Sequence, residues 1–322
     1  MPKVSVIVPI YGVEKYIERC ARSLFEQTLT DIEYIFIDDC SPDKSLEVLQ
    51  TALKEYSSRL VEDKKVVRIE RMSVNSGLPA VRRHGIELAT GDYIAHCDSD
   101  DWVELDMYEQ MYNEALLNDA DVVVCDYNIT NGVSDFKTVS ACHAKNPNQL
   151  LENCLMQIDS WSLWNKLFKR KLYSNIVFPK GAMGEDMVTT IQLLWKCSSL
   201  SYIEKSFYQY FYNPSSITKV CTKESCIQKY NQLVLNTEIV MNFIQSNHLN
   251  KRFYDELVVF KNFIRSVLYP IVYEKYYYQI WNNMFPGLNK QVFLSKRISV
   301  LEKYRVFLTI IHLYPRKRNR AF

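Results

Sequence analysis

A run of acidic residues at 98–101 has the clearest chemical meaning in this sequence. Asp98, Asp100 and Asp101 fall within four positions, directly after the apolar segment 93–95. Carboxylates this close raise one another's pKa unless a cation lies among them. Their oxygens suit Mg²⁺ or Mn²⁺, which usually also hold the phosphates of a substrate. The run therefore indicates a divalent-metal site, and the alternative is a solvated acidic turn that caps the next helix.

Two more candidate residues follow predicted strands. Tyr11 comes directly after the β-branched run 4–10, and Asp39 follows the run 33–37. In a parallel sheet, ligands collect where the carboxyl ends of neighbouring strands meet. Tyr11 suits stacking on a flat ring, and the Asp39 carboxylate suits a ring N–H such as N3 of uracil. The alternative for Asp39 is a charge in the first turn of the following helix.

Arg82, Glu185 and Asp186 are candidates at two helix N-termini. Arg82 lies in the predicted helix 78–88, and a helix N-terminus beside an arginine suits phosphate. The alternative for Arg82 is an exposed base on a solvated face. Glu185 and Asp186 stand at a predicted loop-to-helix junction. A carboxylate there suits a general base that takes a proton from an acceptor hydroxyl, and the alternative is helix capping.

The remaining chemically capable residues fit ordinary packing. Trp161 and Trp164 offer faces for a sugar, although a core position is the commoner case for Trp. His96 fits a core histidine better than a ligand. The nine cysteines form no CxxC pair, so we interpret them as buried thiols. The sequence has no GxxxxGK[ST] and no GxGxxG motif, which argues against ATPase and dinucleotide sites.

Composition narrows the class of protein. The chain has 322 residues, 48% hydrophobic and 24% charged, which is a globular balance. A net charge of +2 is too small to favour nucleic-acid binding by bulk electrostatics. Scattered cysteines and a strand-like start without a signal peptide predict a cytoplasmic protein. The sequence has no apolar run near the ~20 residues that span a bilayer.

Periodicity predicts an α/β domain followed by helices. Strand and helix patterns alternate over the first ~130 residues, which favours a parallel sheet. The expected strands are 4–10, 33–37, 66–70, 93–97 and 120–127, and the expected helices are 14–27, 45–56, 78–88, 106–118 and 187–195. We expect a loop over 131–150 and a buried element over 162–173. Longer helices are expected over 224–247, 252–278 and 290–312, with Pro270 kinking or ending the second. The predicted domain boundary lies near residue 220.

Taken in order, these segments resemble family 2 glycosyltransferases, which have the GT-A fold. Lys3–Tyr11 is similar to the opening strand of that family, and Glu33–Ser41 to its "hydrophobic-DDGS" segment. Asn75–Arg82 resembles its "NxGxxxAR" segment, and 86–101 leads into its DxD motif. The resemblance continues through the acceptor-side segments Trp164–Arg170 and Glu185–Asp186, and through 208–218. It implies a GT-A catalytic domain over 1–220 and a helical region over 221–322.

The resemblance also implies roles for individual positions. Pro9, Tyr11 and Asp39 would hold the nucleotide base and ribose, and Arg82 would face the donor pyrophosphate. The remaining roles are Asp98 and Asp100 for the metal, Asp98 also for the donor ribose, Asp101 for the donor sugar, Trp164 and Glu185 for the acceptor, and Asp186 for the catalytic base.

Two positions depart from the family pattern. Cys40 replaces the usual Gly of the DDGS segment, so we expect that turn to lack a positive φ. Arg83 and His84 stand where Asn and a small residue are commoner, which affects the pyrophosphate end.

The implied function is metal-dependent, inverting transfer of a sugar from a nucleotide-diphosphate sugar, UDP being the expected nucleotide. The acceptor would be a saccharide or lipid-linked saccharide in cell-surface polysaccharide synthesis, with Mn²⁺ or Mg²⁺ as cofactor. The alternatives are a nucleotidyltransferase and a non-catalytic nucleotide-sugar-binding protein. Residues 306–322 join an apolar helix face to a basic tail, which suits peripheral contact with an anionic membrane. A core-packing helix is the alternative, and the Tyr-rich helices suit a homodimer.

Overall fold

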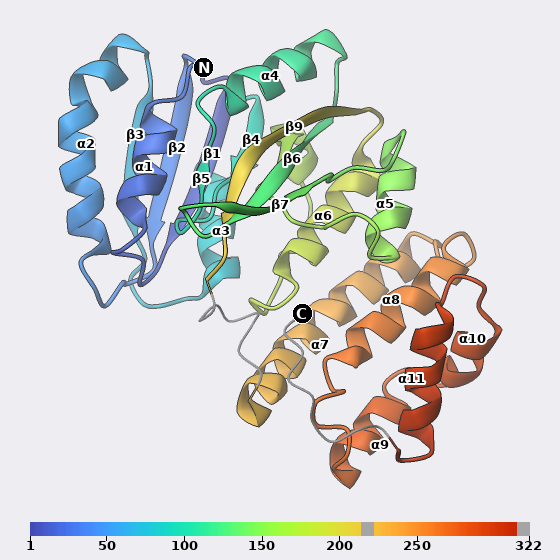
Figure 1. Ribbon diagram of the computed structural model, residues 1–322. Coiled ribbons are helices and arrows are strands. Elements are labelled where there is room, and N and C mark those ends of the chain that lie inside the picture. The colour runs from blue at the N-terminus through green and yellow to red at the C-terminus, as the bar shows by residue number, and fades with distance from the viewer. Residues whose placement is uncertain (214–221, 314–322) are drawn as a thin grey trace.

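The computed structural model describes residues 1–213 and 222–313. A twisted mixed sheet forms its centre, with helices on both faces and a further group of helices toward the C-terminus (Figure 1). The strands are β1 Val4–Ile10, β2 Ile32–Asp38, β3 Val66–Arg71, β4 Tyr93–His96, β5 Trp102–Val103, β6 Val122–Thr130, β7 Asp135–Val139, β8 Lys166–Lys169 and β9 Leu200–Phe211.

The helices form two groups along the chain. The first group contains α1 Ile17–Phe25, α2 Ser45–Glu62, α3 Leu78–Leu88, α4 Met107–Leu117, α5 Pro147–Leu155 and α6 Glu185–Lys196, with a short 3₁₀ helix at Arg170–Tyr173. The second contains α7 Lys223–Ser246, α8 Tyr254–Ser266, α9 Lys275–Asn283, α10 Leu288–Leu294 and α11 Val300–Ile310.

The strand order is β3-β2-β1-β4-β8-β6-β9-β5, and β7 pairs with β6. β1, β2, β3 and β4 are parallel, so the carboxyl ends of β1, β2 and β4 meet at one edge. The prediction of a mostly parallel sheet is confirmed, with one antiparallel strand inserted between β4 and β6. β8 lies between β4 and β6 and is antiparallel to both. β8 has only four residues, Lys-Leu-Phe-Lys, and a pattern this short does not predict an inserted strand.

Alternation within the strands divides the core into two layers. Val4, Val6 and Val8 of β1 face the layer that contains α1, α2 and α4. Ile7, between them, faces the layer with α3, α5 and α6. This second layer extends into α7 and α8, so the helical region shares a core with the sheet domain. A separate cluster around the buried Trp281 joins parts of α7 and α8 to α9, α10 and α11.

Several expected elements differ from the structure. The predicted loop 131–150 contains β7, a polar strand on β6, and the start of α5 at Pro147. The predicted helix 252–278 is α8 and the start of α9, and the chain between them contains Pro270. The predicted helix 290–312 is likewise α10 and α11. Both breaks are local events that an apolar periodicity does not reveal.

The expected boundary near residue 220 lies between β9 and α7, outside the described residues. So do residues 214–218 of the predicted family segment 208–218, and the basic tail after Leu313. Among the described helices, we find none that combines the length and the apolar character required to cross a membrane.

Candidate functional site

The loops after β1 and β2 interlock at the edge of the parallel strands. Gly12 N–H donates to Ser41 Oγ (3.3 Å), Val13 N–H to Ser45 Oγ (2.9 Å) and Glu14 N–H to the Asp43 carboxylate (2.9 Å). These bonds fix the backbone on either side of the predicted nucleotide-binding residues.

The predicted base-binding residues differ in their exposure and in their hydrogen-bond partners. Tyr11 is 54% exposed, so its ring is open to a partner, and Pro9 is half-buried in β1. Asp39 is buried and accepts hydrogen bonds from Ser76 N (2.7 Å) and Gly77 N (2.8 Å). Asp39 therefore already anchors the loop that begins α3, and a ring N–H would need a remaining lone pair of its carboxylate.

The turn at Cys40 corrects one expectation. We expected this turn to lack a positive φ because Cys replaces Gly, but Cys40 has φ +59°. Its Sγ donates to Met72 O (3.0 Å), and the neighbouring Ser41 N–H donates to Asp38 Oδ1 (3.0 Å). These contacts stabilise a backbone conformation that residues other than glycine rarely adopt. The DDGS-like turn is thus preserved without the glycine.

The three carboxylates of the acidic run have different environments. Asp101 is buried and accepts from Tyr208 Oη (2.7 Å) and Phe211 N (2.7 Å). Asp98 keeps a 30% exposed side chain and accepts from Arg82 Nη2 (2.6 Å). Asp100 has no carboxylate contact to another described residue. Burial and the nearby Asp98 raise the Asp100 pKa to about 6. Asp98 and Asp100 are therefore the pair available to a cation.

An arginine that the sequence did not single out supports the acidic run. Arg19 of α1 lies over the Trp102 ring at 3.6 Å, and its Nη2 donates to Asp100 O at 3.1 Å. Such stacking positions a guanidinium without consuming its donors. Because Arg19 and Asp100 are 81 positions apart, no local pattern could have identified the contact.

Arg82 is the centre of the site. It is only 4% exposed, and it donates to Asp98, Glu185 and Asp186. These contacts join α3, the end of β4 and the start of α6. Three carboxylates face one guanidinium, so the cluster keeps an excess of negative charge when all four groups are ionised.

Burial and charge oppose one another in this cluster. Burial disfavours the Arg82 cation, but Glu185, Asp186 and Asp98 outweigh burial and raise its pKa well above the ordinary value. Burial raises the pKa of Glu185 and of Asp98. It acts on Asp186 as well, but there Arg82 prevails and the pKa of Asp186 is lowered. Of the two candidate bases, Asp186 is the one held ionised.

Gly184 fixes where the two carboxylates of α6 begin. It has φ +75°, and a Cβ there would lie 2.9 Å from Leu233 Cδ1. Both observations favour glycine at this position. The turn brings Glu185 and Asp186 to Arg82, 103 and 104 positions away in sequence. α7 thus shapes the entry to α6 through Leu233.

Trp164 packs behind the acidic run. Its ring stacks on Tyr208 (centroids 4.4 Å apart) and meets the Tyr127 ring edge-on at 4.7 Å. It is 7% exposed, so its contact with an acceptor stays a prediction and its observed contacts are with these aromatic side chains. Tyr208 Oη also accepts from Asp98 N (3.0 Å) and so links this aromatic stack to both Asp98 and Asp101. Sequence reasoning missed this role of Tyr208.

Two other buried groups complete the surroundings. His96 is fully buried beside Tyr173 Oη (3.2 Å), and burial lowers its pKa to about 3, as expected of a core histidine. Lys166 is also buried, and its Nζ donates to the carbonyls of Ser160 (2.9 Å) and Ser162 (2.8 Å). Lys166 thereby orders the loop before β8.

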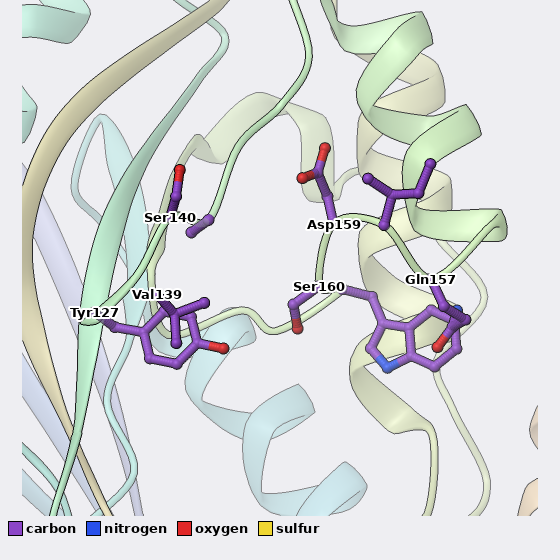
Figure 2. Close-up of a pocket in the computed structure, with 9 residues that line it drawn as sticks. Tyr127, Val139, Ser140, Gln157, Asp159 and Ser160 are labelled. Atoms are coloured by element: carbon purple, nitrogen blue, oxygen red, sulfur yellow. The ribbon is translucent and has the colours of Figure 1, made fainter. Parts of the chain in front are cut away.

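A hollow of about 240 Å³ opens between β7 and this loop (Figure 2). It is lined by Tyr127, Val139, Ser140, Ala141 and residues 157–161. Trp161 O accepts from Thr190 Oγ1 at 2.6 Å. Thr190 lies one helical turn after Asp186, and residues four apart share a helix face. One residue that lines the hollow, Trp161, thus contacts the middle of α6 through its backbone.

A family model described as "Glycosyl transferase family 2" matches residues 5–183, which is more than half of the chain. This chain belongs to glycosyltransferase family 2. The matched range includes Arg82 and the acidic run and ends just before Glu185 and Asp186. The family 2 chain is 30% identical over 237 residues to the uncharacterized glycosyltransferase EpsJ of Bacillus subtilis (strain 168), covering 68% of this chain and 64% of EpsJ.

Other relatives support the same membership. Glycosyltransferase GlyA of Streptococcus pneumoniae serotype 4 is 31% identical over 233 residues, which cover 69% of this chain and 32% of GlyA. The match thus spans less than two thirds of either curated relative. S. aureus TarS 1–349 in complex with UDP-GlcNAc superposes with a TM-score of 0.70 at 18% identity, covering 97% of this chain and 88% of TarS 1–349. At this identity, the likeness establishes the GT-A fold alone.

Proposed function

We propose that this family 2 chain transfers a sugar from a nucleotide-diphosphate sugar, UDP being the expected nucleotide, to an acceptor hydroxyl with inversion. The observation that carries the proposal is the convergence of Asp98, Asp186 and Arg82 at the carboxyl edge of the parallel strands. TarS, which shares the fold, was crystallised with UDP and with UDP-GlcNAc. Tyr11, Pro9 and Asp39 lie at this edge and would contact the base and ribose.

The residues present fit a divalent cation. Asp100 is partly buried with a raised pKa, which Asp98 raises further and Arg19 lowers, and its carboxylate forms no ion pair with a described side chain. The described residues include no group of three His, Cys, Asp or Glu side chains placed to hold a metal ion. Two carboxylates plus substrate phosphates are a usual set for Mg²⁺. When bound there, the ion would supply neutralisation of the leaving diphosphate.

Asp186 would act as the general base. Arg82 holds it ionised and fixes its orientation, so it can accept the proton of an acceptor hydroxyl on Oδ. The hydroxyl oxygen then forms a bond to the anomeric carbon. The bond from that carbon to the diphosphate oxygen breaks, and its electron pair leaves with the nucleoside diphosphate. One displacement at the anomeric carbon inverts its configuration.

The acceptor would approach over the hollow in Figure 2. Trp161 and Tyr127 contribute aromatic surface, and Trp161 O contacts Thr190, one turn of α6 after the base. Glu185 and Trp164 would support the acceptor side, and Asp101, held by Tyr208, would fix the loop that meets the donor sugar. A lipid-linked acceptor, a role in surface-polysaccharide synthesis, a homodimer and a cytoplasmic site of action are further parts of this proposal.

Asp186→Asn provides the test. With UDP-glucose, UDP-galactose, UDP-GlcNAc and GDP-mannose as donors in Mn²⁺, nucleoside diphosphate release is measured alongside calorimetric donor binding. The variant should lose at least about a hundredfold in release rate while binding the donor as before. Asp92→Asn, at an exposed position, serves as the matched control and should retain both. Full turnover by Asp186→Asn would favour a binding protein, and pyrophosphate release from a nucleoside triphosphate would favour a nucleotidyltransferase.

A further inference from the structure

Exposed apolar side chains gather on the last two described helices. Of the 24 exposed large hydrophobic residues in the described chain, eight lie within 293–313. We call these eight residues the α10–α11 surface: Phe293, Leu294, Val300, Leu301, Tyr304, Phe307, Ile311 and Leu313. Scattered apolar side chains are normal on a protein surface, whereas a concentration of this kind marks an interaction site.

The spacing within α11 makes this surface continuous along the helix. Val300, Tyr304, Phe307 and Ile311 recur every three or four residues, so they share one face. Val306 is fully buried on another face of α11, in the cluster around Trp281. α11 therefore has apolar residues on both its inner and its outer face. Among the described residues, packing accounts only for the inner one.

Charge distinguishes this segment from the rest of the chain. Residues 288–322 contain nine Lys or Arg and a single acidic residue, Glu302, whereas residues 1–287 carry a net charge of −6. Glu302 is partly buried, where it pairs with Arg305 (3.0 Å) and accepts from Tyr269 (2.9 Å). The exposed Lys290 and Lys296 have no ion-pair partner among the described residues. A marked charge asymmetry of this kind is typical of a segment that meets an anionic surface.

We propose that the α10–α11 surface binds the interface of an anionic lipid bilayer. An apolar helix face with flanking lysines and arginines is the arrangement that inserts side chains at the headgroup boundary while the basic groups meet anionic lipid. The charge argues against a second copy of this chain on the same surface, because two such segments repel each other. Binding here is independent of the transfer reaction, so either proposal can fail while the other stands.

Vesicle co-sedimentation of the full chain tests the proposal. The protein should sediment with vesicles of phosphatidylcholine that contain 30% phosphatidylglycerol, and much less of it should sediment with pure phosphatidylcholine vesicles. This difference should shrink as the salt concentration rises. Tyr304→Ser with Phe307→Ser should reduce the partition coefficient at least tenfold. Lys290→Ala with Lys296→Ala should reduce it on the order of fivefold per charge.

Matched control variants elsewhere in the chain distinguish binding through this surface from nonspecific adsorption to vesicles. Leu116→Ser with Leu117→Ser removes two exposed apolar residues of α4, and Lys15→Ala with Lys54→Ala removes two exposed charges. Both controls should bind vesicles as the parent chain does, and all variants should keep the parent's unfolding midpoint. Equal binding to neutral and anionic vesicles, or no binding, overturns the proposal. So does light scattering that shows a dimer lost in Tyr304→Ser with Phe307→Ser, since a second copy would then be the occupant.

Discussion

The sheet domain and the C-terminal helices each bury an arginine, and the two are held in opposite ways. Arg82 contacts three carboxylates, which raise its pKa well above the ordinary value against the effect of burial. Arg265 of α8 donates to Asn262 Oδ1 (2.9 Å) and Asn289 Oδ1 (2.6 Å) and lies 4.1 Å from the Trp281 ring. Burial lowers the pKa of Arg265 to about 10.

This difference shows which region is built around charge. Neutral amide oxygens accept from Arg265 and the Trp281 ring packs on it, so Arg265 joins α8 to α10 without a direct carboxylate contact. The Arg82 cluster concentrates negative charge where a cation and a substrate would be handled. The helical region instead places its charge on the surface, in the basic segment around α10 and α11.

Removing each arginine is the strongest way to break the comparison. Arg82→Met leaves three carboxylates without their cation and should lower the free energy of unfolding by about 3–5 kcal/mol. Arg265→Met leaves only amide acceptors unpaired and should cost about 1–3 kcal/mol. Arg83→Met, on the exposed side of α3, should cost less than ~1 kcal/mol. Urea unfolding at pH 7 measures all three.

The pH dependence of the Arg82→Met loss provides a second check. Because burial raises the pKa of Glu185 above its unfolded value, protonation favours the folded state. Lowering the pH from 7 to 5 should therefore restore part of the stability lost in Arg82→Met. A loss that is equal at both pH values, or equal for Arg82→Met and Arg265→Met, contradicts the contrast drawn between the two regions.

Tyr208→Phe tests whether the hydroxyl of Tyr208 supports the acidic run. The change keeps the ring on Trp164 and removes only the hydroxyl that bonds Asp101 and Asp98. Removing one partner of a buried hydrogen bond costs about 1–3 kcal/mol, so unfolding should become easier by that amount. Tyr254→Phe, an exposed hydroxyl on α8, should have no measurable effect. Equal costs at the two positions would remove Tyr208 from the site's support.

Asp100 gives the smallest expected effect, and it depends on pH. Its pKa of about 6 lies above the ordinary value, so the protein gains stability as pH falls through 6, while cation binding needs the ionised form. The affinity for Mn²⁺ with UDP should fall by up to about tenfold per pH unit below 6. Asp100→Asn should weaken this affinity and remove most of its pH dependence, unlike Asp92→Asn. Calorimetry at pH 5 and pH 7 measures this affinity for the parent chain and both variants.

The sequence by itself determined most elements of the first ~130 residues and the chemical types of the site. Strands 4–10 and 33–37 and the helix 78–88 were predicted almost to their ends, because continuous apolar runs and helical spacing report burial directly. The order of strands through β4 let Tyr11, Asp39 and Asp98 be assigned to one sheet edge, since parallel strands present their carboxyl ends together.

Only the tertiary structure decided how those residues are used. The contacts of Arg82 with Glu185 and Asp186, and of Arg19 with Trp102 and Asp100, join positions about 80 to 100 residues apart, and no periodicity encodes a contact between distant elements. The positive φ of Cys40 is held by its own hydrogen bonds and could not be inferred from the residue type. Local pattern fixes which side of an element is buried, but the partner on that side depends on how the whole chain packs.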